Sequence, residues 1–413
     1  MSSILVDATG SISRSSTVAE QPAVGLVCDF VEEGWPSMAY YADTLFDELK
    51  RTGVAVTKIQ PRMPQPAVRL EDWIGSRRVH NIHRLIGRYW SYPRKLKAEQ
   101  QSFDLFHIVD HSYSHLAYVL PPGRVVITCH DIDTFRSVLQ PEVERRPAWF
   151  RMIAGRIREG FQTAARVVCD SKATESEVLS YGLCTPERTV VVLPGVHTSC
   201  SPEPDLVADA QAERLLDSGQ RGVELLLHVG STIPRKRIDV LLSVFSEIQK
   251  VRPQTRLVRV GGPFEAEQER LARSLGILDK IIVLPFLERQ VLAAVYRKAA
   301  LVLLPSESEG FGLPLLEAAA CGAPVVASDI QVLREIGGPA AVYCPVGEIG
   351  HWARTVMELL HEKIEATDSW NLRRTTALHH AARFRWSETA RQISVVYSDL
   401  WQLTRQGKVS SGN

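Results

Sequence analysis

The sequence has no long apolar run and almost no excess of charge. None of its runs approaches the roughly 20 consecutive apolar residues of a membrane span, which predicts that any work at a membrane is done from its surface. Lysine and arginine number 48 against 47 aspartates and glutamates, a net charge of +1. So small a charge argues against a dedicated nucleic-acid binder. The first residues are polar and lack the charged and then apolar stretch of a leader, and we expect residues 1–22 to be a flexible tail.

Cysteine pairs of the CxxC type are also missing. The seven cysteines are scattered along the chain, a pattern that suggests neither a zinc site nor a disulfide framework. Several of them end apolar runs, as buried thiols do in a reducing compartment. The sequence therefore predicts a cytoplasmic protein without a metal site.

The chain does have length, and a regular alternation of short β-rich runs with helical patterns. Its 413 residues exceed what one core usually supports, and the alternation predicts βαβ units with parallel sheets. The first unit is predicted as a strand over 24–30 and a helix over 37–50. We predict an α/β protein of two Rossmann-like, doubly wound domains that face each other across a cleft: a first domain over 23–200, a connection over 201–222 with a short helix near 208–217, and a second domain over 223–385.

The most informative loop follows a predicted strand over 301–304. It carries Glu309, Gly310, Phe311 and Gly312, after which a helix is predicted to begin at Leu313. A helix N-terminus preceded by glycines binds phosphate or hydroxyl oxygens through free backbone N–H groups. Glu317 lies one turn further on, and a carboxylate suits the paired hydroxyls of a ribose or hexose. Two glutamates at this spacing alone favour ordinary solvated residues, but their strand, glycine and proline context favours a ligand site.

A second loop places cations after a predicted strand over 224–229. Gly230 is followed by Arg235 and Lys236, and then by a predicted helix. Cations at the carboxyl end of a strand can neutralise a pyrophosphate and stabilise a departing nucleoside diphosphate without a metal. A solvated basic helix start is the alternative, but positive charge there opposes the helix dipole.

Three weaker signals lie in other loops. His130 and Asp131 follow a predicted strand over 125–129, although a lone pair of this kind is more often structural. Gly34 precedes the first helix, where it suits close approach to a ligand, and Gly262 follows the strand over 256–260.

These motifs resemble those of the family-4 glycosyltransferases, retaining enzymes with the two-domain GT-B fold. The stretch from Glu309 to Glu317 is similar to the family's E-x7-E signature, and residues 230–236 are similar to its G-x4-R-K element. The resemblance implies that Glu309 lies near the donor sugar and diphosphate, that Glu317 binds the nucleotide ribose, and that Arg235 and Lys236 hold phosphate. Ser231 departs from the arginine that many relatives carry.

The resemblance assigns the remaining roles as well. It implies that His130 contacts the transferred sugar, that Gly34 approaches the diphosphate, and that the helix over 386–413 crosses back onto the first domain. The predicted catalytic residues are His130, Arg235, Lys236 and Glu309; the predicted donor-binding residues are Gly34, Gly230, Gly262, Gly310, Phe311, Gly312, Leu313 and Glu317.

Residues 62–97 combine many arginines and lysines with interleaved tryptophan, tyrosine and leucine. Such a segment can lie on an anionic membrane surface or form a solvated helical face, and both interpretations stay open. His107, His111 and His115 are predicted as acceptor-cleft or structural residues rather than metal ligands.

The sequence thus predicts a retaining glycosyltransferase of polysaccharide biosynthesis that needs no cofactor, metal or nucleic acid. It would move a hexosyl unit, with mannosyl favoured by the phosphate loop, from a nucleotide-diphosphate sugar to a glycan or lipid-linked acceptor at the inner membrane face. The alternatives are a sugar phosphorylase or nucleotide-sugar epimerase on the same fold, and a non-catalytic nucleotide-sugar-binding scaffold.

Overall fold

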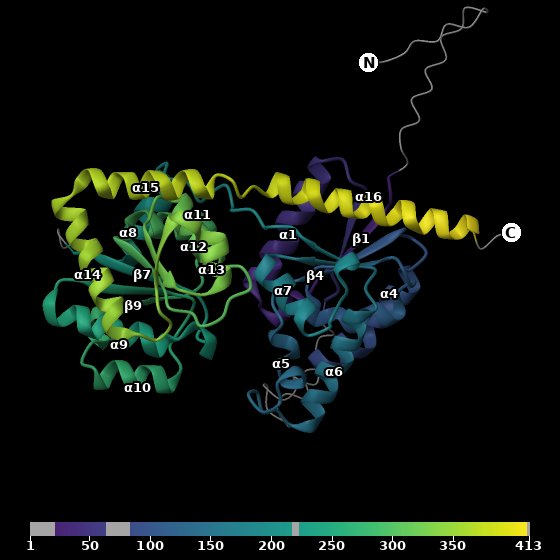
Figure 1. Ribbon diagram of the computed structural model, residues 1–413, viewed down its shortest axis with the longest axis horizontal. Helices are drawn as coiled ribbons and strands as arrows, with labels where there is room; N and C mark the ends of the chain where they lie inside the picture. The colour runs from purple at the N-terminus through teal and green to yellow at the C-terminus, as the bar shows by residue number, and fades with distance from the viewer. Residues whose placement is uncertain (1–20, 63–82, 217–222, 411–413) are drawn as a thin grey trace, which may run out of the picture.

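In the computed structural model the chain folds into two parallel six-stranded sheets, each with helices on both faces (Figure 1). The structure describes residues 21–62, 83–216 and 223–410, with side chains up to residue 406. The architecture is the predicted one: an α/β protein of two doubly wound sheets.

The first sheet has the strand order β2-β1-β3-β4-β5-β6. Its strands are β1 (Val24–Val27), β2 (Val56–Ile59), β3 (Leu105–Ile108), β4 (Val125–Cys129), β5 (Arg166–Cys169) and β6 (Thr189–Val191). Its helices are α1 (Pro36–Arg51), α4 (Tyr92–Glu99), α5 (Asp133–Leu139), α6 (Ala148–Gln162) and α7 (Lys172–Ser180), with shorter turns η1 (Val31–Glu33), η2 (Gly87–Ser91), η3 (His111–Val119) and η4 (Pro186–Arg188).

The second sheet has the order β12-β11-β10-β7-β8-β9. Its strands are β7 (Leu225–Val229), β8 (Arg256–Val260), β9 (Ile281–Leu284), β10 (Leu301–Leu304), β11 (Val325–Ser328) and β12 (Ala341–Cys344). The helices that follow the first sheet in sequence are α8 (Leu206–Leu216), α9 (Ile238–Val251), α10 (Ala266–Ser274), α11 (Arg289–Lys298), α12 (Leu313–Ala320), α13 (Gln331–Gly337), α14 (Ile349–Glu365), α15 (Thr367–Ala381) and α16 (Trp386–Ser410), with turns η5 (Pro234–Lys236), η6 (Leu278–Lys280) and η7 (Gly338–Ala340).

Alternate residues of the central strands supply the two cores of each sheet. In β10, Val302 and Leu304 pack on the face covered by α8, α11, α12 and α13. Leu301 and Leu303 pack on the opposite face, under α9 and α14. Because successive side chains of a strand point to opposite faces, a sheet covered on both sides needs apolar residues throughout. This explains the continuous apolar runs that mark the strands in the sequence.

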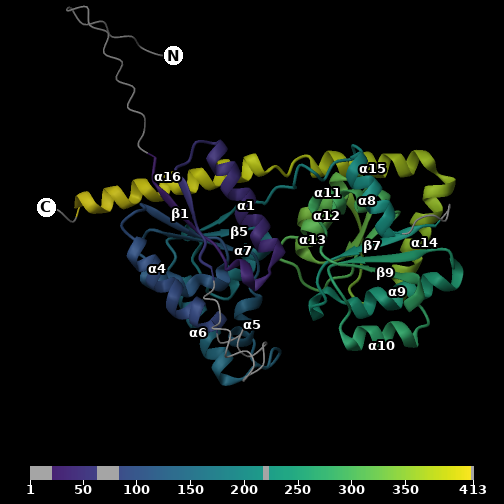
Figure 2. The ribbon, with the colours of Figure 1, turned by 180° about the vertical axis from the view of Figure 1, so that it is seen from behind.

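The long C-terminal helix α16 returns to the first domain. Both views show it continuing from α15 along the upper edge of the molecule and over the first domain (Figure 1; Figure 2), where it packs against α1. Trp386, Ala390 and Ile393 join the core formed by α1 and the first sheet. At the start of α16 the backbone lies very close to Gly195, because a Cβ on Gly195 would be 2.1 Å from the Trp386 backbone nitrogen.

Several elements differ from the sequence-based expectation. The first strand ends at Val27, not at residue 30, and α5, α13 and α15 were not predicted. The short helix predicted near 208–217 is present as α8. It is not a mere connection, because its Ala208 and Ala212 are buried in a core of the second sheet; residues 217–222 lie outside the described residues. Within the described parts of the chain, no helix is long and apolar enough to cross a membrane.

Candidate active site

Lys236 and Glu309 form a buried ion pair at the carboxyl ends of β7 and β10. The Lys236 Nζ lies 2.6 Å from Glu309 Oε1, and the Ser306 hydroxyl donates to the same oxygen at 2.8 Å. Their side chains are 13% and 7% exposed. Burial raises the pKa of Glu309, but Lys236 and Arg235 outweigh this and bring it below its ordinary value. The glutamate is therefore ionised, beside the N-terminus of α12.

Arg235 reaches across to the first domain. Its Nη2 lies 3.2 Å from Asp131 Oδ2 and its Nε 2.9 Å from Asp133 Oδ2. Asp131 and Asp133 follow β4, so the carboxyl end of a first-domain strand faces the predicted phosphate loop, residues 230–236, of the second domain. Burial raises the pKa of Asp131, but His111 and Arg235 hold it below its ordinary value. Both domains thus contribute charged groups to one place.

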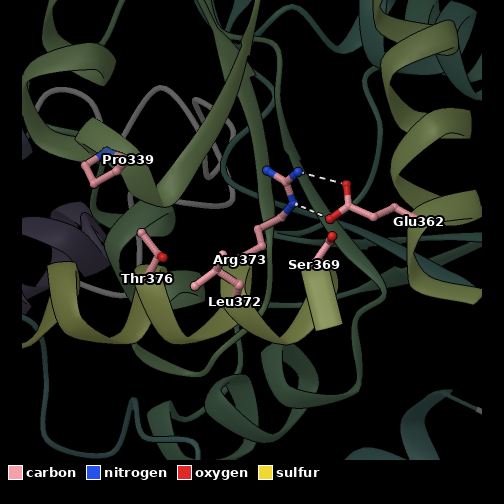
Figure 3. A pocket seen from close by; sticks show the side chains of 6 residues that line it. All are labelled: Pro339, Glu362, Ser369, Leu372, Arg373 and Thr376. Carbon is pink, nitrogen blue, oxygen red and sulfur yellow. Dashed lines mark hydrogen bonds and ion pairs between the residues drawn. The ribbon is translucent and has the colours of Figure 1, made fainter. Parts of the chain in front are cut away.

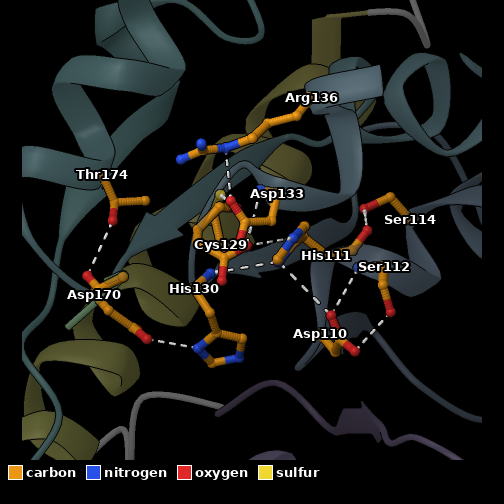
Figure 4. Close-up of polar contacts among 12 residues, drawn as sticks. Asp110, His111, Ser112, Ser114, Cys129, His130, Asp133, Arg136, Asp170 and Thr174 are labelled. Atoms are coloured by element: carbon orange, nitrogen blue, oxygen red, sulfur yellow. Dashed lines mark hydrogen bonds and ion pairs between the residues drawn. The ribbon is translucent and has the colours of Figure 1, made fainter. Parts of the chain in front are cut away.

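His130 is held from both ring nitrogens, and Figure 4 shows the contact of one of them with Asp170. Its Nδ1 lies 2.5 Å from Asp170 Oδ2, and its Nε2 lies 2.8 Å from the Val109 carbonyl oxygen. Burial alone would lower the pKa of His130, but the carboxylate of Asp170 outweighs burial and raises this pKa to about 9. The ring is therefore an imidazolium that donates both N–H groups, and it is not a general base at neutral pH.

Replacing Asp170 by asparagine is expected to destabilise the chain most at low pH. A pKa of about 9 against an ordinary value of 6.5 corresponds to about 3 kcal/mol at most. Because the folded-state pKa is raised, this stability is fully present below pH 6.5 and is lost as the pH rises through 9. Denaturant unfolding of Asp170→Asn and wild type at pH 6, 8 and 10 measures the difference. A gap that stays constant across this range would contradict the assigned ion pair.

Glu317 has its own set of partners. The buried Tyr296 hydroxyl donates to its Oε2 at 3.1 Å and Arg289 donates to its Oε1 at 3.3 Å. Burial raises the pKa of Glu317 above its ordinary value, although Arg289 and Tyr296 oppose the rise. The contacts of the described residues join Lys236 to Glu309, and Arg235 is the residue before Lys236, but none of them joins Glu317 to this group. Glu317 lies about one turn inside α12, whereas Glu309 lies in the loop before it.

The predicted glycine loop packs directly against the first domain. A Cβ on Gly310 would lie 1.8 Å from the His130 carbonyl oxygen, and the Gly310 carbonyl accepts from Ser171 Oγ at 3.0 Å and Thr174 Oγ1 at 3.2 Å. Gly312 has a φ of 94° at the start of α12, a backbone conformation that favours glycine.

The other predicted donor-binding residues differ in what they present. Phe311 is buried in the second core, with its ring 6.3 Å from that of Phe384, so its side chain is structural. Leu313 packs against cores of both domains. Gly230 lies near Lys236, since its Cβ would be 3.8 Å from the Lys236 Cε. Gly34 lies in the first domain at the end of η1, with a φ of 69°. None of the described contacts joins it to Lys236.

The sequence analysis missed Arg259, a residue that holds two of the predicted donor-binding loops in place. Arg259 of β8 is buried, and its guanidinium donates to the carbonyl oxygens of Gly230 and Gly262. It thereby fixes two of the predicted donor loops. Its position inside an apolar strand run was the available signal, because a charged residue there is rarely buried without a purpose.

His107 lies within β3, and His111 and His115 follow it in η3. His107 bonds to Tyr397 at 2.6 Å and Thr128 at 2.7 Å, and burial lowers its pKa to about 3. His115 bonds to the Arg88 carbonyl. His111 lies 3.6 Å from Asp131 and is the histidine of this group that reaches the interdomain charges.

A surface hollow of about 450 Å³ lies elsewhere (Figure 3). It is lined by residues of η7, α14 and α15, where Arg373 pairs with Glu362. No predicted site residue lines it.

The fold matches solved structures along nearly the whole chain. The sucrose-phosphate synthase of Thermosynechococcus elongatus superposes with a TM-score of 0.70 over 93% of this chain and 100% of that chain, at 19% identity. The Anabaena protein Alr3699/HepE, solved in complex with UDP-glucose, superposes with a TM-score of 0.68 over 91% of this chain and 99% of that chain, at 18% identity. At these identities the match concerns the fold, which is the GT-B class.

Two family models match the two domains separately. The model described as Glycosyltransferase Family 4 matches residues 38–199, and the model described as Glycosyl transferases group 1 matches residues 218–374. The D-inositol 3-phosphate glycosyltransferase of Thermobispora bispora is 33% identical over 249 residues, covering 57% of this chain and 56% of that protein. Matches to such curated relatives span 51% to 63% of their length. The chain belongs to the family-4, group 1 glycosyltransferases.

Proposed function

We propose that the chain transfers a hexosyl unit from a nucleoside-diphosphate sugar to a hydroxyl acceptor, with retention of configuration. One arrangement carries the proposal: Lys236 and the ionised Glu309 lie in contact beside the N-terminus of α12, with Arg235 adjacent. Positive charge and backbone N–H groups meet there at the carboxyl ends of strands, where open α/β sheets bind ligands. A related fold solved with UDP-glucose is consistent with a nucleotide-sugar donor.

The cations of the second domain would stabilise the departing group. When the bond between the anomeric carbon and the diphosphate oxygen breaks, the electron pair goes to the oxygen. Arg235, Lys236 and the α12 dipole can stabilise that charge without a metal. In a retaining transfer the acceptor proton can pass to the departing oxygen. This agrees with a His130 ring that is already protonated.

Release of nucleoside diphosphate tests this proposal. The chain is incubated with UDP-, GDP- and ADP-hexoses, GDP-mannose among them, and with candidate acceptors. D-inositol 3-phosphate belongs in the acceptor panel because the curated relatives are named for it. We expect nucleoside diphosphate and a glycoside of unchanged anomeric configuration in equal amounts. Sugar phosphate would indicate a phosphorylase, an altered donor would indicate an epimerase, and donor-dependent thermal stabilisation without any product would indicate a scaffold.

We further propose that the first domain binds to the surface of an anionic membrane. Of the predicted basic segment 62–97, residues 63–82 lie outside the described residues, and residues 83–99 are helical. This helix exposes Trp90 by 61%, and the adjoining α6 exposes Trp149 by 58% and Met152 by 71%. Tyr89 and Met152 line one shared hollow, so the two helices are neighbours.

Exposed cations accompany these apolar side chains, namely Arg94, Lys95 and Lys97 on the first helix and Arg145, Arg146 and Arg151 at or near the start of α6. Apolar insertion combined with positive charge is what binds anionic lipid headgroups. The same charge opposes the approach of a second copy of this surface. A lipid-linked acceptor would be met at such a membrane.

Replacing both tryptophans of this surface by serine is expected to lower vesicle binding about tenfold or more. Co-sedimentation with phosphatidylglycerol vesicles measures the binding, with phosphatidylcholine vesicles expected to bind weakly. The double variant Leu206→Ser, Leu372→Ser, which removes two exposed leucines of α8 and α15, should bind as wild type does. Equal binding by Trp90→Ser, Trp149→Ser and wild type would contradict the membrane proposal.

A further inference from the structure

Arg289 connects the two domains beside Glu317. It is the first residue of α11, and its Nη1 donates to Glu317 Oε1 at 3.3 Å. Its guanidinium carbon lies 3.2 Å from the centre of the Tyr40 ring, and Tyr40 belongs to α1 of the first domain. One side chain of the second domain therefore contacts both the predicted ribose-binding carboxylate and the opposite domain.

The contacts with Glu317 and Tyr40 explain why an arginine is favourable at position 289. A cation in the first turn of a helix opposes the helix dipole, so α11 itself does not favour an arginine there. The attraction comes instead from the Glu317 carboxylate and from the face of the Tyr40 ring, which binds guanidinium groups. In return, Arg289 opposes the rise that burial causes in the Glu317 pKa. It thus favours the ionised form that can accept two ribose hydroxyls.

Tyr40 is fixed by the segments that join the domains. Its hydroxyl accepts from Trp386 Nε1 at 2.7 Å, and its ring stands edge-on to Trp386, with the ring centres 5.6 Å apart. The centre of the His197 ring, on the segment between β6 and α8, lies 5.8 Å from the centre of the Tyr40 ring. Because Trp386 begins α16, the surface that receives Arg289 is set by the crossing between the domains.

We propose that Arg289 is a positioning residue for the nucleotide donor. It orients the Glu317 carboxylate toward the donor ribose and makes that orientation depend on contact with Tyr40 of the first domain. The inference rests on the proposed function, because it takes the donor ribose as the ligand of Glu317. Donor binding and domain contact then strengthen each other, since each favours the same placement of the guanidinium.

The first test compares donor KM and kcat of single variants in the full chain. Arg289→Ala should raise the donor KM about tenfold or more, the effect of losing a hydrogen bond to a charged group. Tyr40→Leu, which removes the cation–π contact, should raise it about fivefold, and in both variants kcat should change less than about threefold. The double variant should be no worse than the more severe single variant, because the two residues act through one contact. Arg297→Ala is the matched control: it lies on the same helix and pairs with Asp209.

The second test is the pH dependence of donor binding. If Arg289 had only a structural role, its replacement would leave this pH profile unchanged. Donor affinity should fall as the pH falls through the pKa of Glu317, because the protonated acid accepts hydroxyl hydrogen bonds less well. Without Arg289 that pKa rises further, so in Arg289→Ala the decline begins at a higher pH. Arg289→Lys keeps the charge and should return the profile toward that of wild type.

The outcomes separate the inference from the function on which it rests. A wild-type chain that releases no nucleoside diphosphate from any donor contradicts the proposed function. Wild-type turnover, with the donor KM of Arg289→Ala within about twofold of wild type and an unmoved pH profile, contradicts the inference alone. If Arg289→Ala does not unfold cooperatively, Tyr40→Leu and Arg289→Lys decide. An unchanged donor KM in Tyr40→Leu then overturns the proposal.

Discussion

Lys236→Ala is expected to lower kcat/KM for the donor by about 10²–10³-fold, the usual effect of removing one group that stabilises transition-state charge. Its ammonium lies 2.6 Å from Glu309, in the loop before α12, and its side chain is 13% exposed. Steady-state kinetics of nucleoside diphosphate release measure the loss. The fall should appear in kcat, because the charge on the departing oxygen develops in the transition state.

Two further variants show whether that loss comes from the missing cation. Lys236→Ala leaves Glu309 without its cation, so Lys236→Arg, which keeps a positive charge at this position, should lose less activity than Lys236→Ala. Lys280→Ala removes an exposed lysine paired with Asp279 and should match wild type. Near wild-type turnover in Lys236→Ala, with the protein cooperatively folded, would show that the phosphate loop has been assigned wrongly.

Gly310→Ala is expected to have the second largest effect, about 10²-fold in kcat/KM. Its Cβ would lie 1.8 Å from the His130 carbonyl oxygen and 3.3 Å from the Asp131 Cβ, distances that force the two domains apart at this point. A displacement of about 1 Å is enough to cost about 10²-fold in rate. Kinetics of nucleoside diphosphate release again measure the effect, together with thermal unfolding.

Gly350→Ala is the matched control for this variant. Gly350 lies in α14, and the nearest atom that its Cβ would meet is 3.8 Å away. This variant should keep wild-type kinetics. Full activity in Gly310→Ala would mean that catalysis does not need the contact between the α12 loop and His130.

The architecture and the positions of the loops could be predicted from the sequence because both depend on local patterns. Strands buried on both faces appear in the sequence as apolar runs. The glycine loop together with Pro314 predicts the start of α12 from the sequence alone. The same local signals placed Lys236 and Glu309 in loops that follow two strands, and the structure shows that these strands are neighbours and that the two residues are in contact. Phe311 shows the limit of such patterns, because its loop position suggested donor contact while its ring is buried.

The remaining parts of the site depend on contacts between residues far apart in the sequence. Asp170 raises the pKa of His130 from a different strand end, and Tyr40 meets Arg289 across the domains. No spacing or period encodes these pairs, since they arise only once both sheets have formed and α16 has crossed back. The sequence did carry one indirect sign of Arg289, namely a cation at a helix start, where the helix dipole disfavours it.

The most direct test of the account is a crystal structure of the chain with a bound nucleoside diphosphate. The account predicts that the diphosphate oxygens accept hydrogen bonds from Lys236, Arg235 and the N-terminal N–H groups of α12, with both ribose hydroxyls on Glu317. A nucleotide bound elsewhere, with the Lys236–Glu309 pair undisturbed and out of its reach, would contradict it.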